Sequence, residues 1–302
     1  FVNLSPNDCQ KISFLEVEID GKIKKYQPYL ESYFSLLDNK KTNFFTDISN
    51  YLSYELGQPT HCYDRRKLKS GLTFENKTCN EKFKTVLNNE VLLEGKNCIF
   101  TSDNKIVGLA GIMGGLSTAC DNSTYKVLIE CAYFKPESII SKSLKYNLDS
   151  DAAYKFERGV DMHSQIIVLK RFLQIISEHA TIKNAKIISK SYSDEPLRNL
   201  PIDEKKVNSI LGTKIGKEKL IEYLRNLDFD VSDKIYVPSF RHDISSQNDI
   251  AEEIARLIGY DQIEKSPLQI KRIVTSENKK DINSLKEYLI KKGFNEVINF
   301  PF

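Results

Sequence analysis

Apolar and polar residues alternate in short stretches of the first 190 residues, as they do in strands that bury one face. Residues Leu15 to Ile19 alternate in this way and end at Asp20-Gly21, a pair that favours a turn. Asp103-Asn104 predicts a second turn, between two neighbouring strands. The further strands predicted from apolar runs are Val91–Leu93, Cys98–Phe100, Ile106–Ala110 and Lys126–Phe134. These strands predict a sheet-containing N-terminal domain.

Apolar residues recur at helical spacing in two other parts of this region. The first is Tyr29 to Leu37, and the second is the clearly amphipathic stretch Ile166 to Ile176. Strands and helices are therefore mixed along the first part of the chain.

A second, mainly helical unit is predicted after a linker at Ser191 to Pro196. Asp203 is placed to cap a helix that ends at Leu211-Gly212, where glycine is free to adopt the left-handed conformation. Residues 235–238 predict a strand. The other predicted helices are 217–227, 249–258 and 282–292.

Composition narrows the class of protein only slightly. Lysine and arginine (44) nearly balance aspartate and glutamate (41), and a net charge of +3 on 302 residues does not by itself indicate nucleic-acid binding. No apolar run approaches the roughly 20 residues of a membrane helix, and no signal peptide is visible. Six scattered cysteines without a CxxC pair favour free thiols in a reducing cytoplasm over zinc or disulfides. The chain opens without Met and stops in an apolar stretch, so we expect a piece of a longer protein.

Eight segments occur in an order and at a spacing that resemble the β subunit of bacterial phenylalanyl-tRNA synthetase. They are TDISNY (46–51), GQPTHCYD (57–64), GLAGIMGG (108–115), IECAYF (129–134), FERGVD (156–161), PSFRHDI (238–244), EEIAR (252–256) and GYD (259–261). The resemblance covers most of the chain.

The resemblance implies an α+β fold with three parts. A mixed-sheet tRNA-editing domain of the B3/B4 type would occupy residues 1–192. A small α+β, winged-helix-like domain of the B5 type would follow at 197–266. Residues 267–302 would begin a class II synthetase-like catalytic core, cut short.

Such an enzyme must reject tyrosine, which differs from phenylalanine by one hydroxyl. An apolar pocket rejects an added hydroxyl only by roughly 10²-fold, so a second, hydrolytic site is the general remedy. Glu130 lies inside an otherwise apolar strand, where a carboxylate is costly to bury, and it is the expected acceptor for the phenol hydroxyl. Ala132, two residues on, faces the same side and leaves room for the ring. From the residues alone, Glu130 could equally be a strand-end carboxylate paired with a lysine.

The resemblance also assigns the wall of this editing pocket. His61 follows Pro59 in a rigid turn and would lie near the scissile ester, where a neutral imidazole could hold water or ribose. The glycines at 108, 111, 114 and 115 lack the GK[ST] ending of a phosphate loop. They favour close approach by substrate or by a neighbouring strand, with Gly114 and Gly115 as pocket wall. A lone histidine is otherwise more often structural.

A carboxylate cluster follows residue 240. Asp249, Glu252 and Glu253 would share a face of a helix that starts at Asp249, and Asp243 could fold back to join them. Oxygen ligands of this kind suit Mg²⁺, and the resemblance implies magnesium at the contact with the α subunit. The competing interpretation is a capping box formed by Asp249 and Glu252.

The resemblance implies that this chain supports ATP-dependent charging of tRNA(Phe) in a cytoplasmic α2β2 ligase and hydrolyses mischarged Tyr-tRNA(Phe). ATP would be bound mainly by the α subunit. The basic run Arg65 to Lys69 could contact tRNA, although a run of this kind more often forms a solvated face. Two alternatives stay open, a freestanding editing hydrolase and an editing-defective structural subunit. The family usually has apolar residues where Thr60, Cys62 and Tyr63 stand, and arginine at Lys155.

Overall fold

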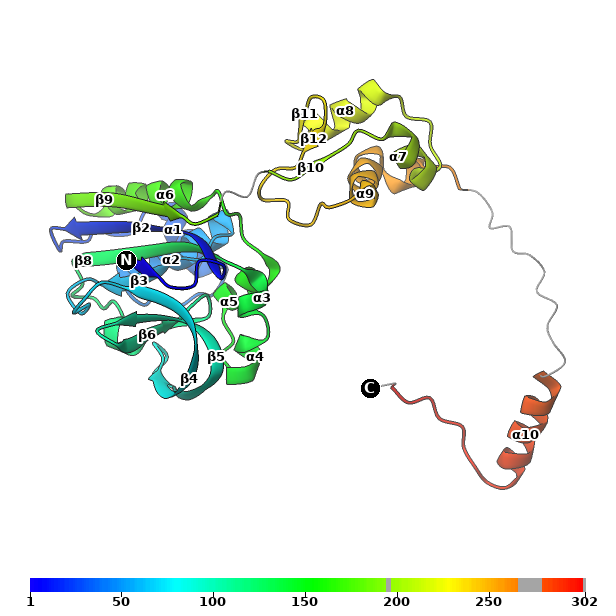
Figure 1. Cartoon of the computed structure of the whole chain (residues 1–302), viewed down its shortest axis with the longest axis horizontal. Helices are drawn as coiled ribbons and strands as arrows, with labels where there is room; N and C mark the ends of the chain where they lie inside the picture. Colours follow the sequence, from blue (N-terminus) through cyan, green and yellow to red (C-terminus); the bar gives the residue numbers. More distant parts are fainter. Residues whose placement is uncertain (194–196, 266–278, 301–302) are drawn as a thin grey trace. The chain divides into compact units, whose positions relative to one another are not determined.

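The computed structural model describes residues 1–193, 197–265 and 279–300 (Figure 1). The first of these segments contains a four-stranded antiparallel sheet with the strand order β3-β8-β2-β9. Its strands are β2 (Cys9–Ile19), β3 (His61–Asp64), β8 (Lys126–Phe134) and β9 (Ile182–Ser191). The alternation of side chains along β2 and β8 gives this sheet two apolar faces, so both faces must be covered.

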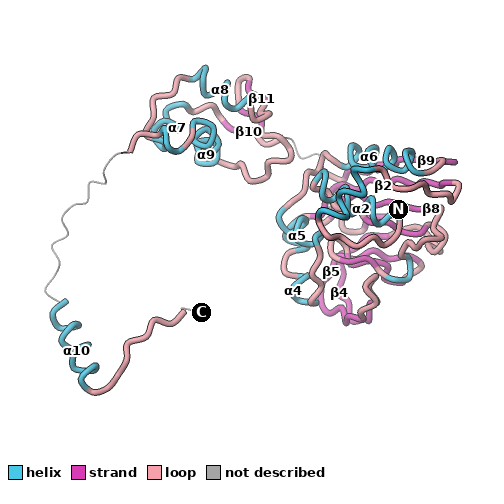
Figure 2. Tube along the Cα trace, turned by 180° about the vertical axis from the view of Figure 1, so that it is seen from behind, coloured by secondary structure: helices cyan, strands magenta, loops and turns pink. Residues whose placement is uncertain are grey.

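Helices cover one face of this sheet (Figure 2). They are α2 (Phe44–Leu56) and α6 (Gln165–His179), and α1 (Pro28–Leu36) packs on α2 through ring contacts with Tyr51. Phe45 of α2 and Phe172 of α6 are buried against Leu15 and Ile129 of the sheet. Helix α2 has Asn43 as its N-cap, whose side chain accepts the Thr46 amide, and Gly57 in the left-handed conformation as its C-cap.

A second, five-stranded sheet covers the other face. Its order is β1-β4-β5-β6-β7, and it is mixed because β1 runs parallel to β4. Its strands are β1 (Val2–Asn3), β4 (Thr73–Lys84), β5 (Glu90–Ser102), β6 (Lys105–Leu109) and β7 (Met113–Gly114). Phe14 and Phe134 from the first sheet pack with Phe74 and Phe100 from the second in one aromatic core. The domain therefore has three layers: helices, a four-stranded sheet and a five-stranded sheet.

Short helices close one end of the inter-sheet core after β8. They are α3 (Pro136–Ile139), α4 (Lys142–Tyr146) and α5 (Asp151–Arg158), and a 3-10 turn, η1 (Leu116–Thr118), precedes β8. Helix α5 buries Phe156 against Phe134 with the ring centroids 5.0 Å apart.

Residues 197–265 form a smaller α+β domain with a three-stranded sheet, β10-β12-β11. Its elements are β10 (Asn199–Leu200), α7 (Glu204–Leu211), α8 (Lys217–Arg225), β11 (Asp230–Val231), β12 (Ile235–Tyr236), α9 (Gln247–Ile258) and η2 (Tyr260–Gln262). Val207, Leu220, Ile235 and Ile254 are buried. Helix α10 (Lys279–Lys291) belongs to the third described segment, 279–300.

Most of the elements predicted from sequence are confirmed. The strand 126–134 is β8, the Asp103-Asn104 turn joins β5 to β6, and α7 has Asp203 as its N-cap and Gly212 as its C-cap. The helices expected at 29–37, 166–176, 217–227 and 282–292 correspond to α1, α6, α8 and α10.

Other element predictions are wrong or lacking. Residues 91–93 and 98–100 are not separate strands, because β5 pairs with β4 continuously through the exposed Glu94-Gly95-Lys96 segment. Strands β4 and β9 and helix α2 were not predicted. Residues 194–196 of the predicted linker and 267–278 of the predicted core segment lie outside the described residues. Within the described ranges, no helix is long and apolar enough to cross a bilayer.

Candidate functional site

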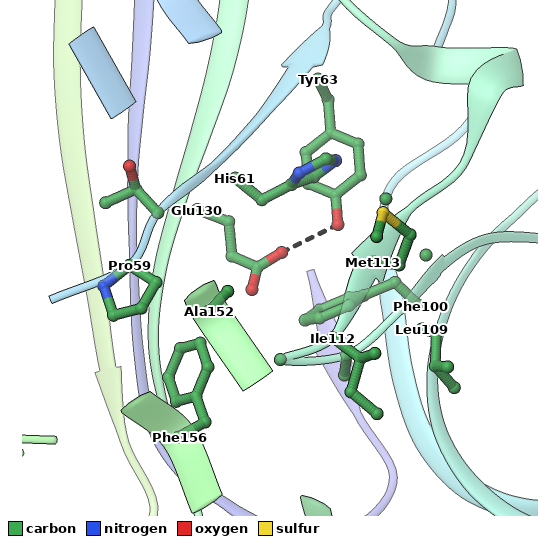
Figure 3. A pocket seen from close by; sticks show the side chains of 15 residues that line it. Pro59, His61, Tyr63, Phe100, Leu109, Ile112, Met113, Glu130, Ala152 and Phe156 are labelled. Atoms are coloured by element: carbon green, nitrogen blue, oxygen red, sulfur yellow. Dashed lines mark hydrogen bonds between the residues drawn. The ribbon is translucent and has the colours of Figure 1, made fainter. Parts of the chain in front are cut away.

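A cavity of about 70 Å³ lies in the core between the two sheets (Figure 3). Its lining residues come from β3 and the turn before it, β5, the β6–β7 hairpin, β8 and α5. They are Pro59, Thr60, His61, Tyr63, Phe100, Gly108, Leu109, Ala110, Gly111, Ile112, Met113, Gly114, Glu130, Ala152 and Phe156. The predicted pocket residues Pro59, His61, Gly114 and Glu130 are among them.

Strand pairing brings the polar side chains of this cavity together. In the antiparallel β3–β8 pair, His61 stands directly opposite Glu130, so both side chains point to the same face. Tyr63, two residues after His61, lies on that face as well. Cys62, between His61 and Tyr63, and Ile129, just before Glu130, face the helices instead.

Glu130 is buried in the middle of β8, with 6% of its surface exposed. Its Oε2 accepts a hydrogen bond from the Tyr63 hydroxyl at 2.8 Å. Burial raises the pKa of the Glu130 carboxyl to about 8, although the hydrogen bond from Tyr63 acts in the opposite direction. The carboxyl is therefore largely protonated at neutral pH. The alternative of a strand-end carboxylate paired with a lysine is wrong, because the partner is a tyrosine in the core.

His61 is held neutral by the same environment. Burial lowers the pKa of its imidazole to about 4. Its ring meets the Tyr63 ring edge to face, with the centroids 4.4 Å apart. Its Nε2 is buried and has no hydrogen-bond partner among the described residues. Leaving a buried polar atom unpaired costs about 1–3 kcal/mol, so this nitrogen is suited to bind a hydroxyl or a water.

Gly114 is required for this position of the histidine. A Cβ on Gly114 would lie 2.1 Å from Cε1 and 2.6 Å from Nε2 of His61, so any larger residue would push the ring away. A side chain at Gly115 is excluded by a different neighbour, because a Cβ there would lie 2.6 Å from the backbone oxygen of Val107 on β6. The close approach at Gly115 is thus to a neighbouring strand.

Two predicted pocket residues do not line the cavity. Gly115 is one, and Ala132 is the other: it is buried in the inter-sheet core, and its carbonyl accepts a hydrogen bond from the Gln58 side chain at 3.0 Å. Space in the cavity is left instead by Gly108, Gly111 and Ala152. Gly108 and Gly111 are among the glycines for which a close approach was predicted, whereas Ala152 had no signal in the local sequence.

Helix α5 is fastened to the cavity wall by Ser150. Its hydroxyl donates to the carbonyl of Ile112 at 2.8 Å and accepts the amide of Ala153 at 3.0 Å. One side chain thus caps α5 and holds the β6–β7 hairpin, placing Ala152 and Phe156 at the cavity. The pattern Ser150-Asp151-Ala152-Ala153 is a recognisable cap signal, but its link to Ile112 is not.

The four departures from the family pattern occupy different places. Thr60 and Tyr63 line the cavity, whereas Cys62 packs toward the helices. Lys155 donates to the carbonyl and the hydroxyl of Ser53 at 2.6 and 2.8 Å, which ties α5 to α2. Two of the departures therefore bear directly on the pocket.

Three of the four carboxylates predicted to gather after residue 240 bond to other groups of the protein. Arg241 donates to both Asp243 and Glu253, and Arg256 also donates to Glu253. These hydrogen bonds, led by Arg241, lower the pKa of both carboxyls. Glu252 is exposed while Glu253 is buried, so the two point in different directions.

Asp249 acts at the start of helix α9, but not as predicted. The helix begins at Gln247, so the capping box of Asp249 with Glu252 is wrong. Asp249 instead reaches back and accepts the backbone amides of Ser245 and Ser246, both at 2.8 Å. Across residues 1–193, 197–265 and 279–300, no three His, Cys, Asp or Glu side chains are grouped to hold a metal ion. In this arrangement the four carboxylates do not fit a magnesium site.

Three cations of the predicted basic run have carboxylate partners. Arg66 binds Asp64 at 2.7 Å, Lys67 binds Asp121 at 2.7 Å, and Arg65 lies 3.5 Å from Glu16. A phosphate backbone would have to compete with these pairs.

Comparison with known proteins gives two domain families and a consistent set of relatives. Residues 22–181 match the B3/4 domain, and residues 200–260 match the tRNA synthetase B5 domain. The phenylalanine–tRNA ligase β subunit of Francisella tularensis is 32% identical over 275 residues, covering 86% of this chain and 34% of that protein. The β subunit of Syntrophus aciditrophicus is 35% identical over 272 residues, covering 85% and 34%.

The chain spans about a third of the length of these relatives. Among solved structures, an N-terminal fragment of the phenylalanyl-tRNA synthetase β subunit from Pyrococcus horikoshii matches with a TM-score of 0.39 and 13% identity. That match covers 86% of this chain and 74% of the other.

Proposed function

This chain belongs to the phenylalanine–tRNA ligase β-subunit family, with its B3/4 and B5 domains, and from this premise we propose that its B3/4 domain hydrolyses mischarged Tyr-tRNA(Phe). The observation that carries the proposal is the strand register that sets His61 of β3 opposite Glu130 of β8, with both residues lining a cavity of the inter-sheet core. A largely apolar cavity with a few convergent polar groups is the usual form of a small-ligand site.

Each group has a chemical role in this proposal. The Glu130 carboxyl accepts the hydroxyl of a tyrosyl side chain, which a phenylalanyl side chain lacks. The unpaired Nε2 of neutral His61 holds the attacking water or the terminal ribose beside the ester. Gly114 leaves the space that keeps the imidazole in place.

The test is deacylation of preformed Tyr-tRNA(Phe) and Phe-tRNA(Phe) by the wild-type chain and by Glu130→Ala and His61→Ala. We expect tyrosine to be released faster than phenylalanine, Glu130→Ala to lose that preference, and His61→Ala to lose most of the rate. The exposed residues Glu90 and His163 provide matched controls as Glu90→Ala and His163→Ala. A folded wild-type chain that releases neither amino acid, alone and in the complete ligase, would refute the proposal.

The role of the whole protein is a broader part of the same proposal. As a β subunit it would assemble with the α subunit into a cytoplasmic α2β2 ligase that uses ATP, bound mainly by the α subunit, to charge tRNA(Phe). Residues 197–265 would be winged-helix-like, and 279–300 would begin the catalytic-like core. The B5 match disfavours a freestanding editing hydrolase. Co-purification of the full-length protein with an α subunit and tRNA(Phe) tests this assembly.

An editing-defective structural subunit is the second candidate, and one observation favours it. The Tyr63 hydroxyl already donates a hydrogen bond to the Glu130 carboxyl, and the volume of the cavity is only about 70 Å³. This candidate predicts normal charging of tRNA(Phe) by the complete ligase with no deacylation of Tyr-tRNA(Phe).

Magnesium at Asp243, Asp249, Glu252 and Glu253 remains a proposal that requires Arg241 to release its two carboxylates. If so, Arg241→Met binds MgCl2 more tightly than the wild type by isothermal titration calorimetry, because it leaves Asp243 without its cation and Glu253 with Arg256 alone. Equal or absent magnesium binding in both proteins would contradict it.

A further inference from the structure

The hydroxyl of Tyr63 already bonds to one oxygen of the carboxyl that the proposed function assigns to a tyrosyl ligand. It donates to Glu130 Oε2 at 2.8 Å, and both side chains are buried (Figure 3). Burial, followed by the adjacent Glu130, raises the pKa of the Tyr63 phenol well above its ordinary value, so the phenol keeps the proton with which it can donate to Oε2. The protein thus presents its own phenol to the carboxyl.

The ring of Tyr63 is fixed in this position from several sides. It meets the His61 ring edge to face at 4.4 Å and lies near the Phe100 ring at 6.4 Å. A Cβ on Gly108 would stand 3.5 Å from its hydroxyl oxygen, so the backbone of β6 also approaches the phenol closely. The contact with Glu130 is therefore a packed feature of the core.

This contact changes how the pocket can distinguish its ligands. A buried acceptor favours a hydroxylated ligand because the ligand without the hydroxyl leaves the acceptor unpaired. Since Tyr63 pairs the carboxyl in the absence of ligand, a phenylalanyl side chain leaves nothing newly unpaired at Oε2. A tyrosyl side chain would first have to displace the Tyr63 hydroxyl or share the carboxyl with it.

We propose that Tyr63 determines the specificity of this pocket: its hydroxyl satisfies Oε2 of Glu130 from within the protein, so that the wild-type cavity keeps only a small part of the preference for tyrosyl over phenylalanyl groups that Glu130 would otherwise give. The inference rests on the proposed function for the identity of the ligand. It adds Tyr63 as the residue that sets the preference between tyrosyl and phenylalanyl groups.

The size of the cavity agrees with this role. An engineered apolar cavity of roughly 150 Å³ binds benzene, whereas the cavity beside Glu130 holds about 70 Å³. An aromatic ring therefore enters only when lining side chains move. Tyr63 both lines the cavity and holds the carboxyl, so its displacement would free space and acceptor together.

The experiment measures binding of p-cresol and toluene, which carry the tyrosine and phenylalanine rings without the ester. NMR titrations use the wild type, Tyr63→Phe, and Tyr146→Phe as the matched control, because Tyr146 is another buried tyrosine whose hydroxyl bonds to Asn97 at 2.8 Å. The wild type and the control should bind the two ligands within threefold of each other. Tyr63→Phe should prefer p-cresol by about 10-fold or more, because Glu130 then finds a hydroxyl only on the ligand.

Two outcomes overturn the inference. One is a Tyr63→Phe variant, folded by circular dichroism, that shows no preference for p-cresol. The other needs no variant: a wild-type chain that already prefers p-cresol by 10-fold or more.

Deacylation assays on the same proteins separate this inference from the proposed function. If Tyr63→Phe gains the p-cresol preference but no protein releases tyrosine from tRNA, the inference stands and the hydrolytic function fails. If the wild type hydrolyses Tyr-tRNA(Phe) selectively and Tyr63→Phe does not change the ligand preference, the function stands and the inference fails.

Discussion

Glu130 and His61 share one environment, and burial moves their pKa values in opposite directions. The pKa of the carboxyl rises to about 8 and that of the imidazole falls to about 4, because desolvation favours the neutral form of each. Neither group carries a full charge in the folded protein between pH 4.5 and 7. The cavity therefore offers hydrogen bonds to a ligand without the cost of a buried charge.

These shifts predict how stability depends on pH. Between pH 4.5 and 6.5 the two effects oppose each other, since the folded state holds the Glu130 proton while the unfolded state holds the His61 proton. From pH 6.5 to 8 only the Glu130 effect remains, and it lowers the free energy of unfolding as pH rises, by about 2 kcal/mol. Urea unfolding at pH 6.5 and 8 should show this fall in the wild type and not in Glu130→Gln.

The control for this prediction is Glu90→Gln, since Glu90 lies on the surface of β5 and pairs with Lys82. It should keep the wild-type pH dependence. An equal fall in Glu130→Gln would mean that another group is responsible.

At the scale of elements, the cavity depends on how α5 and the β6–β7 hairpin meet β8. Gly111 turns the hairpin with a φ of +69°, and a Cβ there would lie 3.1 Å from Phe134 and 3.2 Å from Phe156. Ser150 joins the two elements through its bond to Ile112. Single substitutions at Gly111 or Ser150 would therefore act on the cavity wall.

Ser150→Ala removes both the cap of α5 and the bond to Ile112. We expect a loss of about 2 kcal/mol in the free energy of unfolding, because a helix cap and a buried hydrogen bond each contribute about 1 kcal/mol. Urea unfolding measures it. Ser177→Ala, an exposed serine within α6, should change stability by less than about 0.5 kcal/mol. Equal effects of the two substitutions would show that Ser150 does not fasten these elements.

At the scale of the whole molecule, both large apolar clusters lie in the first described segment of the chain. Residues 1–193 contain two apolar clusters on opposite faces of one sheet. In 279–300, by contrast, apolar side chains are exposed: Ile282 by 56%, Leu285 by 58% and Ile298 by 99%. A 13-residue helix is only marginally stable by itself in water.

Deletion of residues 266–302 tests this division. The shortened chain should keep the unfolding free energy of the wild type within about 0.5 kcal/mol, because it keeps both clusters. It should also self-associate less in analytical ultracentrifugation, since exposed apolar surface promotes association. A loss of cooperative unfolding would show that the deleted residues stabilise the rest of the chain.

The sequence by itself determined features that depend on neighbouring residues. The apolar run around Glu130 predicted a buried strand, and Asp203 with Gly212 predicted both ends of α7, because caps and periodic patterns act within a few residues. Strands β4 and β9 escaped prediction because many of their residues are polar and exposed. What makes them strands is a hydrogen-bonded ladder with a partner distant in sequence.

Tertiary structure alone decided which groups meet. The bond between Tyr63 and Glu130 joins residues 67 positions apart, and it exists because the β3–β8 register places His61 opposite Glu130. Spacing along β8 placed Ala132 on the same face as Glu130, but which elements cover that face depends on the second sheet and α5. The carboxylates after residue 240 were predicted to gather, yet Arg241 pairs with two of them, because the fold decides which cation reaches each carboxylate.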